Sequence, residues 1–440
     1  MMNTVYFYTL GCKVNTCESE EIAENLKTLG YETVAAPPAG VAVVNSCTVT
    51  GESGRKTRQT LRRARRENPG AVVILTGCHT QAFPDAAEAL PEADIVVGNR
   101  ANALIPEYLA EFLSTSRRIV RTAEHEKGEK FSAPQVSGTA HHTRAFFKIQ
   151  DGCDRFCSYC IIPYAKGRSR SRTLDDIRET VARFAANGYK EVVLVGIDLS
   201  DYGKDLDGAR LSDAVNAAAS VDGIARVRLG SLEPHNFTAE EIARLASCEK
   251  LCPQFHLSLQ SGSDEVLKRM NRRYTAQEYA AIVGALRASF KDCMITTDII
   301  CGFPGETEEE FLETVEFAKK IRFEKVHIFP YSLREGTRAA KMPDQITKTV
   351  KDGRCARLAE VCGAIRKELL AAQIGKEYDV LFETPSGGKM HGYTPNYMPV
   401  SVVSDEDLRG TIRRVRILSA DENGCEGELC RKTEAIACKF

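Results

Sequence analysis

The sequence predicts an α/β fold of three parts: an N-terminal parallel-sheet βα domain, a central partial (β/α)6 barrel and a small C-terminal β-barrel. Two observations predict the first two parts, because short apolar runs alternate with helix-like segments over residues 1–113 and again over residues 139–370. A third observation predicts the last part, since residues 371–440 change to closely spaced strand-like runs with turns between them. Residues 114–138 lose apolar periodicity and are predicted to be a linker.

Length and composition are those of a multidomain globular protein. The chain has 440 residues, 43% of them hydrophobic, which is enough for two or three domains. Its formal net charge of −1 means that any nucleic-acid-binding surface must be local. No signal-peptide pattern is present, and no apolar run reaches the roughly 18 residues of a membrane span, so we expect a cytoplasmic protein without a membrane partner. In that setting, 16 cysteines indicate metal or redox chemistry rather than disulfides.

Three cysteines follow successive predicted strands of the N-terminal domain. The strand-like runs are 4–9, 41–45, 72–76 and 94–97, and the thiols after the first three are Cys12, Cys47 and Cys78. The carboxyl ends of parallel strands share one edge of the sheet, where such folds bind ligands, so these thiols can converge on one cluster. The alternative is that each is a small buried residue. Cys17 lies on the following helix, does not fit the pattern and is interpreted as a spare thiol.

A basic segment follows the second of these strands. Residues 54–66 carry seven basic residues in thirteen positions, and on a helix several of them share a face. Arg62, Arg65 and Arg66 are candidates for contacts with RNA phosphates. An ordinary solvated helix surface is an equally good interpretation.

The central barrel is predicted from six strand-like runs with helical patterns between most of them. The runs are 145–149, 191–195, 226–229, 254–259, 294–300 and 325–329. Six βα units fit an open barrel, short of the closed eight-unit form, with its chemistry at the carboxyl ends of the strands.

Three thiols with C-x3-C-x2-C spacing come directly after the first barrel strand. They are Cys153, Cys157 and Cys160. Three thiolates can hold an iron–sulfur cluster that leaves one iron open to a small molecule, whereas a structural zinc site is normally closed by a fourth ligand. One alternative is zinc completed by a distant Cys or His. Another is a thiol-redox protein, because Cys157 and Cys160 have the C-x-x-C spacing of such sites.

Small or polar residues follow the later barrel strands. They are Gly196, Glu233, Ser261 and the glycine-containing segment 302–306. Any single glycine turn is weak evidence, since turns need glycine. Several such strand ends beside a cysteine loop predict a platform that backbone and side chains offer to a ligand.

The C-terminal module carries basic and aromatic residues that are typical of small RNA-binding barrels. Those singled out are Arg409, Arg413, Arg414, Arg416, Tyr393 and Tyr397. Such barrels commonly bind single-stranded or looped RNA. Ordinary surface charge is the alternative, and Cys425, Cys430 and Cys438 have no informative spacing.

Together these motifs resemble the methylthiotransferase family of radical S-adenosylmethionine (radical SAM) enzymes along nearly the whole chain. GCKVN, NSCTVT and TGC, around Cys12, Cys47 and Cys78, are similar to the auxiliary-cluster motifs of that family. DGCDRFCSYCIIPYAKGRSRSR resembles its radical SAM loop, and LSLQSGSDEVLKRMNRRYT, DIICGFPGETEEEF and VHIFPYSLREGT resemble its later core segments. The C-terminal module is similar to the family's RNA-binding TRAM domain.

The resemblance implies a transferase with two [4Fe–4S] clusters and SAM as cofactors. SAM would bind the cluster held by the catalytic cysteines Cys153, Cys157 and Cys160, and a second SAM would methylate sulfur at the N-terminal cluster. Tyr159 would pack on the SAM adenine, and the other implied SAM contacts are Gly196, Glu233, Ser261, Gly302 and Glu306. The implied partners are the anticodon stem-loop of tRNA and an electron donor such as flavodoxin or ferredoxin.

Within the family, GCKVN, SRSR and the PYS-REGT segment resemble the subgroup that methylthiolates C2 of N6-threonylcarbamoyladenosine in tRNA. This substituent carries a carboxylate that an arginine could bind bidentately, and Arg168, Arg170 and Arg172 follow the cysteine loop. Pairing of these arginines with Asp or Glu on the barrel rim is the alternative. Enzymes that modify isopentenyladenosine or a ribosomal-protein aspartate remain open, as does a zinc-containing RNA-binding protein.

Overall fold

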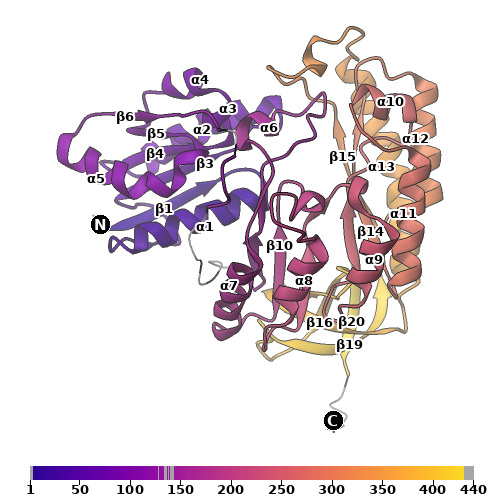
Figure 1. The fold of residues 1–440 in the computed structure, drawn as a ribbon. Helices are drawn as coiled ribbons and strands as arrows, with labels where there is room; N and C mark the ends of the chain where they lie inside the picture. The colour runs from indigo at the N-terminus through magenta and orange to yellow at the C-terminus, as the bar shows by residue number, and fades with distance from the viewer. Residues whose placement is uncertain (1–2, 127, 133–135, 137, 139–142, 431–440) are drawn as a thin grey trace.

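The computed structural model describes residues 3–126, 128–132, 136, 138 and 143–430, and it has the three predicted parts (Figure 1). An N-terminal α/β domain lies beside a partial (β/α) barrel, and a small closed β-barrel lies at one end of the partial barrel (Figure 1). The predicted fold class is therefore confirmed. Cys438 and residues 127, 133–135 and 137 of the predicted linker lie outside the described residues.

The N-terminal domain is a six-stranded parallel sheet in the order β2-β1-β3-β4-β5-β6. The strands are β1 (Thr4–Thr9), β2 (Glu32–Thr33), β3 (Val41–Ser46), β4 (Val72–Gly77), β5 (Ile95–Val97) and β6 (Ile119–Arg121). The helices are α1 (Lys13–Lys27), α2 (Gly51–Glu67), α3 (Cys78–Ala82), α4 (Pro84–Glu88) and α5 (Ile105–Thr115), with a 3-10 turn η1 (Asn99–Leu104). Strands β3 and β4 are buried along their whole length because α1 and α5 cover one face of the sheet and α2 and α4 the other. Burial on both faces explains their continuous apolar sequence.

The predicted linker begins too early. Strand β6, which lies inside the predicted 114–138 segment, pairs in parallel with β5 and completes the N-terminal sheet. The strand is only three residues long and lies directly after two arginines, so its sequence carries no strand signal that could be recognised without the sheet.

The partial barrel consists of two parallel sheets, β11-β10-β7 and β12-β13-β14-β15, which adjoin where Gly230 separates β11 from β12. The strands are β7 (Ala145–Lys148), β10 (Glu191–Val195), β11 (Arg226–Leu229), β12 (Ser231–Leu232), β13 (Gln254–Leu257), β14 (Met294–Cys301) and β15 (Lys325–Pro330), and β8 (Gln150–Asp151) pairs with β9 (Arg170–Ser171) beside them. The helices are α6 (Ile162–Lys166), α7 (Leu174–Ala186), α8 (Leu211–Ala219), α9 (Ala239–Ala246), α10 (Asp264–Arg269), α11 (Ala276–Ser289), α12 (Glu308–Ile321) and α13 (Lys348–Ala371), with 3-10 turns η2 (Leu199–Asp201), η3 (Pro234–Asn236) and η4 (Ala339–Lys341).

Threonine caps set where several barrel helices begin. The side chains of Thr173, Thr238, Thr275 and Thr307 each accept a hydrogen bond from a backbone N–H in the first turn of α7, α9, α11 and α12. In α11 and α12 a glutamate three residues later completes a capping box. These caps satisfy N–H groups that a helix start otherwise leaves without partners. Among the helices of the described residues, none combines the length and the apolar character that a membrane span requires.

The C-terminal module is a closed five-stranded barrel in the order β16-β17-β18-β20-β19. Its strands are β16 (Glu377–Ser386), β17 (Lys389–Tyr393), β18 (Pro399–Val403), β19 (Ile412–Ala420) and β20 (Cys425–Leu429). It has its own core, to which Cys425 belongs. Two arginines of β11 fasten it to the partial barrel: Arg226 donates to the Asp379 and Tyr393 carbonyls, and Arg228 donates to the Pro395 carbonyl at 2.9 Å.

Tyr393 and Tyr397, predicted to be part of an RNA-binding face, lie in this domain interface instead. Their rings stack at 4.7 Å, and the Tyr397 ring lies beneath the guanidinium groups of Arg144 (5.1 Å) and Arg228 (4.6 Å). The two aromatic rings therefore stabilise the junction between the domains through cation–π contacts. Sequence composition could not distinguish this internal use from an exposed RNA-stacking surface.

The N-terminal domain covers the open side of the partial barrel and contacts it on two flanks. On one flank, Val14 and Cys17 of α1 pack against Phe146, Val193 and Val195 of the barrel strands. On the other, the loop after β15 reaches the sheet edge: the Gly51 N–H donates to Ser332 Oγ at 3.0 Å, and Arg334 bonds Thr48 Oγ1. Cys17 is accordingly part of the apolar interface, which explains why it does not fit the cysteine pattern.

Beneath α1, five buried charged side chains form what we call the Glu18 network: Glu18, Glu21, Lys148, Asp151 and Lys166. The Lys148 ammonium lies 3.1 Å from Glu18, 3.2 Å from Glu21 and 3.4 Å from Asp151. Lys166 of α6 forms an ion pair with Glu18. Burial alone would lower the pKa of Lys148, but the three carboxylates raise it well above its usual range. The network therefore joins α1 to β7 and α6 through charges that depend on one another.

Replacing one partner of such a network leaves buried charge uncompensated. We expect Glu18→Gln to lower the free energy of unfolding by about 3 kcal/mol, because Lys166 loses its carboxylate. The denaturation midpoint in urea, followed by circular dichroism, measures this against Glu313→Gln, which changes an exposed glutamate of α12. Equal midpoints for the two variants would contradict the role of the network.

Candidate metal and cofactor site

Cys12, Cys47 and Cys78 form a group that we call the N-terminal triad. They follow β1, β3 and β4, which are neighbours in the sheet, and the structure brings them together at its carboxyl edge. Cys12 caps α1, and Cys78 is the first residue of α3. Burial raises the pKa of the Cys78 thiol to about 12, with further upward contributions from Cys12 and Cys47. The thiols are therefore close enough to act on one another.

Two glycines and one asparagine allow the strand ends to approach this closely. Gly77 has φ +100°, and a Cβ there would lie 2.4 Å from the Ser46 carbonyl oxygen. Gly11 has φ +102°, and a Cβ there would lie 3.0 Å from Cys47 Sγ. Asn15 Nδ2 donates to the carbonyls of Leu10 (2.7 Å) and Ser46 (3.0 Å), which holds the ends of β1 and β3 together. Only glycine adopts these turns without strain.

Cys153, Cys157 and Cys160 form a second group, the loop triad, between β8 and α6. Burial raises the pKa of Cys160 to about 12, with Cys157 adding to the rise, and burial also raises the pKa of Cys153. Gly152 begins the loop at φ +74°, where a Cβ would lie 1.9 Å from the Arg168 carbonyl oxygen. Asn271 holds the middle of the loop by donating to the Phe156 carbonyl at 3.0 Å.

Arg272 is a residue that the sequence analysis missed. Its guanidinium donates to Cys157 Sγ at 3.3 Å and forms an ion pair with Glu233 at 2.8 Å. A cation beside a thiol favours the thiolate, the form that binds metal. In the loop triad Arg272 acts to lower the pKa of Cys160, and in the N-terminal triad Lys166 and Arg334 act to lower the pKa of Cys78 and Cys47, each against the larger upward effect of burial. The only sequence signal was the pair of arginines in MNRRYT, far from either cysteine motif.

The spacing of the thiols helps to distinguish a zinc site from an iron–sulfur cluster. Zinc–sulfur bonds of about 2.3 Å at tetrahedral angles place two sulfurs about 3.8 Å apart. Within the described residues, the groups of three ligand atoms that lie within 4.8 Å of one another are two His/Asp groups, and neither cysteine triad is among them. In each triad at least one pair of sulfurs is therefore more than 4.8 Å apart, which is wider than one zinc ion bound by all three thiolates requires.

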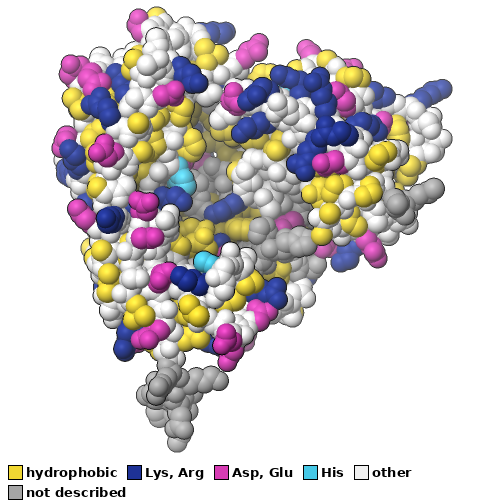
Figure 2. All heavy atoms as spheres, turned by 180° about the vertical axis from the view of Figure 1, so that it is seen from behind, with side chains coloured by type: hydrophobic (Ala, Val, Ile, Leu, Met, Phe, Trp, Pro, Cys, Tyr) yellow, Lys and Arg dark blue, Asp and Glu magenta, His cyan; other side chains and the backbone are white. Residues whose placement is uncertain are grey.

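The two triads lie on elements that touch. Helix α6, which begins two residues after Cys160, packs on α3, which begins at Cys78. The 3-10 turn η1 also contacts α6, since Asn99 Nδ2 donates to the Ala165 carbonyl at 2.7 Å. Seen from behind, the molecule is hollowed between the N-terminal domain and the barrel (Figure 2). Lys13, next to Cys12, is close enough to the barrel residue His327 to affect its pKa.

The predicted ligand contacts fall into two groups. Tyr159 and Glu233 lie beside the loop triad: Tyr159 packs edge-on against Phe303, and Glu233 is paired with Arg272. Gly196 lies against Gln150, with room for no side chain. By contrast, Ser261 Oγ is 3.1 Å from Thr314 Oγ1 of α12, and Glu306 pairs with Arg354 of α13 and accepts from the Gly302 N–H. Ser261 and Glu306 therefore hold the platform to its helices, and their contact with a ligand stays a prediction.

The predicted RNA contacts also differ in accessibility. Arg62, Arg66, Arg168, Arg413 and Arg414 are exposed. Arg65 donates to the carbonyls of Ala71 and Glu92 and pairs with Asp94 at 2.7 Å. Arg172 is 1% exposed and pairs with Asp176 at 2.8 Å, and Arg170 pairs with Asp151. For Arg170 and Arg172 the structure thus favours the alternative of ion pairs within the barrel. Arg65 is engaged in an ion pair and backbone contacts of its own, which neither interpretation of the basic segment predicted.

Comparisons with known proteins show which families the chain is similar to. Residues 147–318 match the model of the Radical SAM superfamily, and residues 4–98 match that of the Uncharacterized protein family UPF0004. The chain is 38% identical to the threonylcarbamoyladenosine tRNA methylthiotransferase MtaB of Bacillus subtilis (strain 168), over 98% of each chain. It is 37% identical to the protein of the same name from Thermotoga maritima, over 96% of each. It is also 35% identical to the tRNA-2-methylthio-N(6)-dimethylallyladenosine synthase of Clostridium botulinum (strain Loch Maree / Type A3), over 96% of each.

Among solved structures, the fold is similar to the radical S-adenosylmethionine methyltransferase TsrM from Kitasatospora setae. The form with tryptophan and a SAM analogue gives a TM-score of 0.55 at 15% identity, covering 82% of this chain and 89% of that one. The form with cobalamin and a [4Fe-4S] cluster gives a TM-score of 0.53 at 16% identity, covering 75% of each. This likeness concerns the fold.

If each triad holds one [4Fe–4S] cluster, the anaerobically reconstituted protein will contain about eight iron atoms. Changing Cys12, Cys47 and Cys78 to Ala should leave about four, and so should changing Cys153, Cys157 and Cys160. Cys17→Ala is the matched control and should keep the full load, because Cys17 packs in an apolar interface. Full iron in either triple variant would show that the ligands are assigned wrongly.

Proposed function

Because this chain belongs to the radical SAM methylthiotransferase family that acts on tRNA, we propose that it converts N6-threonylcarbamoyladenosine beside the anticodon into its 2-methylthio derivative. The observation that carries the proposal is the placement of two cysteine triads on touching elements of two domains. Support for the threonylcarbamoyl substrate comes from the near full-length similarity to relatives of that name. Relatives named for the dimethylallyl substrate match almost as well, so isopentenyladenosine is the second candidate.

The cofactors that fit the site are two [4Fe–4S] clusters and SAM. Cys153, Cys157 and Cys160 would hold the cluster that binds SAM, and Cys12, Cys47 and Cys78 would hold the auxiliary cluster. The cofactors supply the one-electron cleavage of SAM and the carriage of sulfur. An electron donor such as flavodoxin or ferredoxin, and a cytoplasmic location, belong to the same proposal.

The chain's own residues would bind and orient the cofactors and shield them from water. Arg272 donates a hydrogen bond to Cys157 Sγ and fixes Glu233 at the edge of the platform. Lys166 forms an ion pair with Glu18 and also acts on the Cys78 thiol. The charges of the Glu18 network therefore influence the N-terminal triad. The N-terminal domain, by covering the open barrel, restricts access of water to the space between the triads.

The surface proposed for tRNA is the exposed face of α2. Its exposed basic residues are Arg55, Lys56, Arg58, Arg62, Arg63 and Arg66. Figure 2 shows Lys and Arg side chains gathered on the N-terminal domain beside the hollow. Phosphates bound there would leave an unstacked base of the anticodon loop within reach of the hollow.

The substrate is tested by offering the reconstituted enzyme three substrates in parallel: tRNA with threonylcarbamoyladenosine, tRNA with isopentenyladenosine, and the ribosomal protein. We expect the methylthio group only on the first, detected by mass spectrometry of the nucleosides and peptides. Modification of either other substrate, with none on the first, would overturn the substrate assignment and leave the family membership intact.

The RNA surface is tested with Arg62→Gln combined with Arg66→Gln. Loss of two phosphate contacts should weaken tRNA binding about tenfold and reduce the salt slope by about 2, while SAM cleavage without RNA stays unchanged. The matched control removes two charges from α12, with Lys319→Gln and Lys320→Gln. Equal tRNA affinities for the two double variants would show that the α2 arginines form an ordinary solvated surface.

A further inference from the structure

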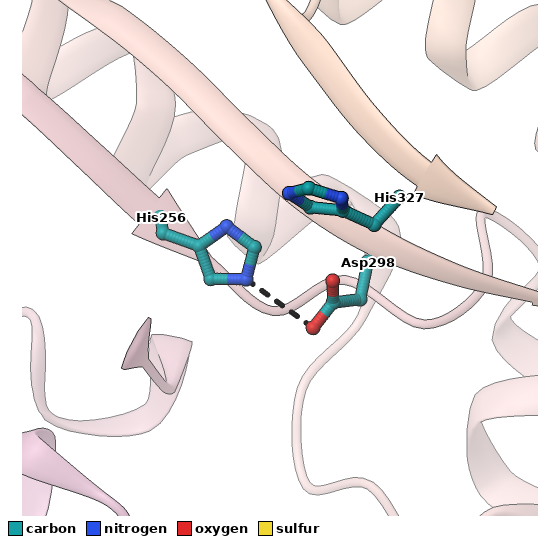
Figure 3. Close-up of side chains that lie close together, drawn as sticks. All are labelled: His256, Asp298 and His327. Carbon is teal, nitrogen blue, oxygen red and sulfur yellow. Dashed lines mark hydrogen bonds and ion pairs between the residues drawn. The ribbon is translucent and has the colours of Figure 1, made fainter. Parts of the chain in front are cut away.

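Three polar side chains meet inside the barrel where the proposed function has not used them. His256 of β13, Asp298 of β14 and His327 of β15 come from neighbouring parallel strands, and their nitrogen and oxygen atoms lie within 4.8 Å of one another (Figure 3). His256 Nε2 lies 3.2 Å from Asp298 Oδ2, and His256 Nδ1 lies 3.0 Å from Thr296 Oγ1. We call these three residues the lumen group.

The strand alternation places the lumen group next to the loop triad. Ile300, two residues after Asp298, packs in the cluster of apolar residues that includes Tyr159. The carbonyl of Ser258, two residues after His256, accepts from Arg272, which bonds Cys157. Two residues of a strand span about 6.6 Å. The lumen group therefore lies two residues along β13 and β14, or about 6.6 Å, from the residues that touch the cysteine loop.

One wall of this space is open. Val326 and Ile328 of β15 pack outward against the barrel core, so Lys325, His327 and Phe329 face the other side. All three are exposed, and Phe329 is 48% exposed. A cation, an imidazole and an aromatic ring thus line the same accessible face of one strand.

The charges around the lumen group favour an anion over a metal cation. Burial lowers the pKa of His327; Asp298 opposes this, and His256, Lys325 and Lys13 lower it further. Two lysines are therefore close enough to act on the group, while Asp298, its carboxylate, is engaged by His256. A divalent ion would be repelled by both ammonium groups, whereas a carboxylate would be attracted.

We propose that Lys325 and His327 bind the carboxylate of the N6 substituent of the target adenosine, with Phe329 stacking on the base. The His256–Asp298 pair fixes the neighbouring side of the subsite. This proposal rests on the proposed function and makes it specific: an isopentenyl substituent, which has no carboxylate, gains nothing from Lys325. Charge-assisted hydrogen bonds are the stronger kind, so the discrimination resides in this contact.

The test compares two anticodon stem-loops, one with threonylcarbamoyladenosine and one with its neutral methyl ester. The reconstituted wild-type enzyme should bind the carboxylate form about tenfold more tightly. Lys325→Met and His327→Asn should each reduce this ratio towards one and raise KM for the tRNA. Lys325→Arg should restore the ratio, and the surface variant Lys320→Met should keep it.

An unchanged ratio in both variants, or no preference in the wild type, would overturn the inference. So would one equivalent of zinc or manganese that is lost from His256→Ala and His327→Ala, because the lumen group would then be a metal site. Turnover separates this failure from that of the proposed function. If the wild type methylthiolates threonylcarbamoyl tRNA but the affinity ratio does not depend on Lys325, only the inference fails. If the wild type does not methylthiolate this tRNA at all, the proposed function fails.

Discussion

The buried ion pairs of the Glu18 network are the constraint on which the arrangement of the molecule depends. Glu18 belongs to the N-terminal domain, whereas Lys148 and Lys166 belong to the barrel, so the Glu18–Lys166 pair forms only when the domains meet, and Lys148 would otherwise keep Asp151 as its carboxylate partner. Because Cys12 caps α1 and α6 follows Cys160, satisfying these charges also fixes the two cysteine triads relative to each other. Removing one partner of a buried pair is costly, which gives the junction its specificity.

The hollow follows from that junction. A partial barrel is open on one side, and here the N-terminal domain covers the opening through α1 on one flank and the loop after β15 on the other. The C-terminal barrel is held at the other end by Arg226 and Arg228. Chemistry and RNA contact are thus divided: the strand ends face the covered space, and the basic helix α2 lies outside it.

Local patterns predicted what depends on local structure. The sequence alone predicted the strand-like runs, the thiols at their ends and the change to short strands after residue 371. It could do so because strand ends, loops and turns have their own residue preferences. Contacts with residues that are distant in the sequence could not be predicted. Arg172 and Tyr397 look like RNA contacts in sequence, yet one meets Asp176 and the other meets Arg228. Strand β6 needs β5 beside it, and the lumen group is apparent only once three strands are aligned.

Two separate iron–sulfur centres are expected to face one space between the domains. Anomalous diffraction at the iron edge, from crystals of the anaerobically reconstituted protein, would locate them. We expect two iron peaks, one bonded to Cys12, Cys47 and Cys78 and the other to Cys153, Cys157 and Cys160, both bordering the hollow. A single iron peak, a centre that takes cysteines from both triads, or anomalous signal at the zinc edge in place of iron would contradict this expectation.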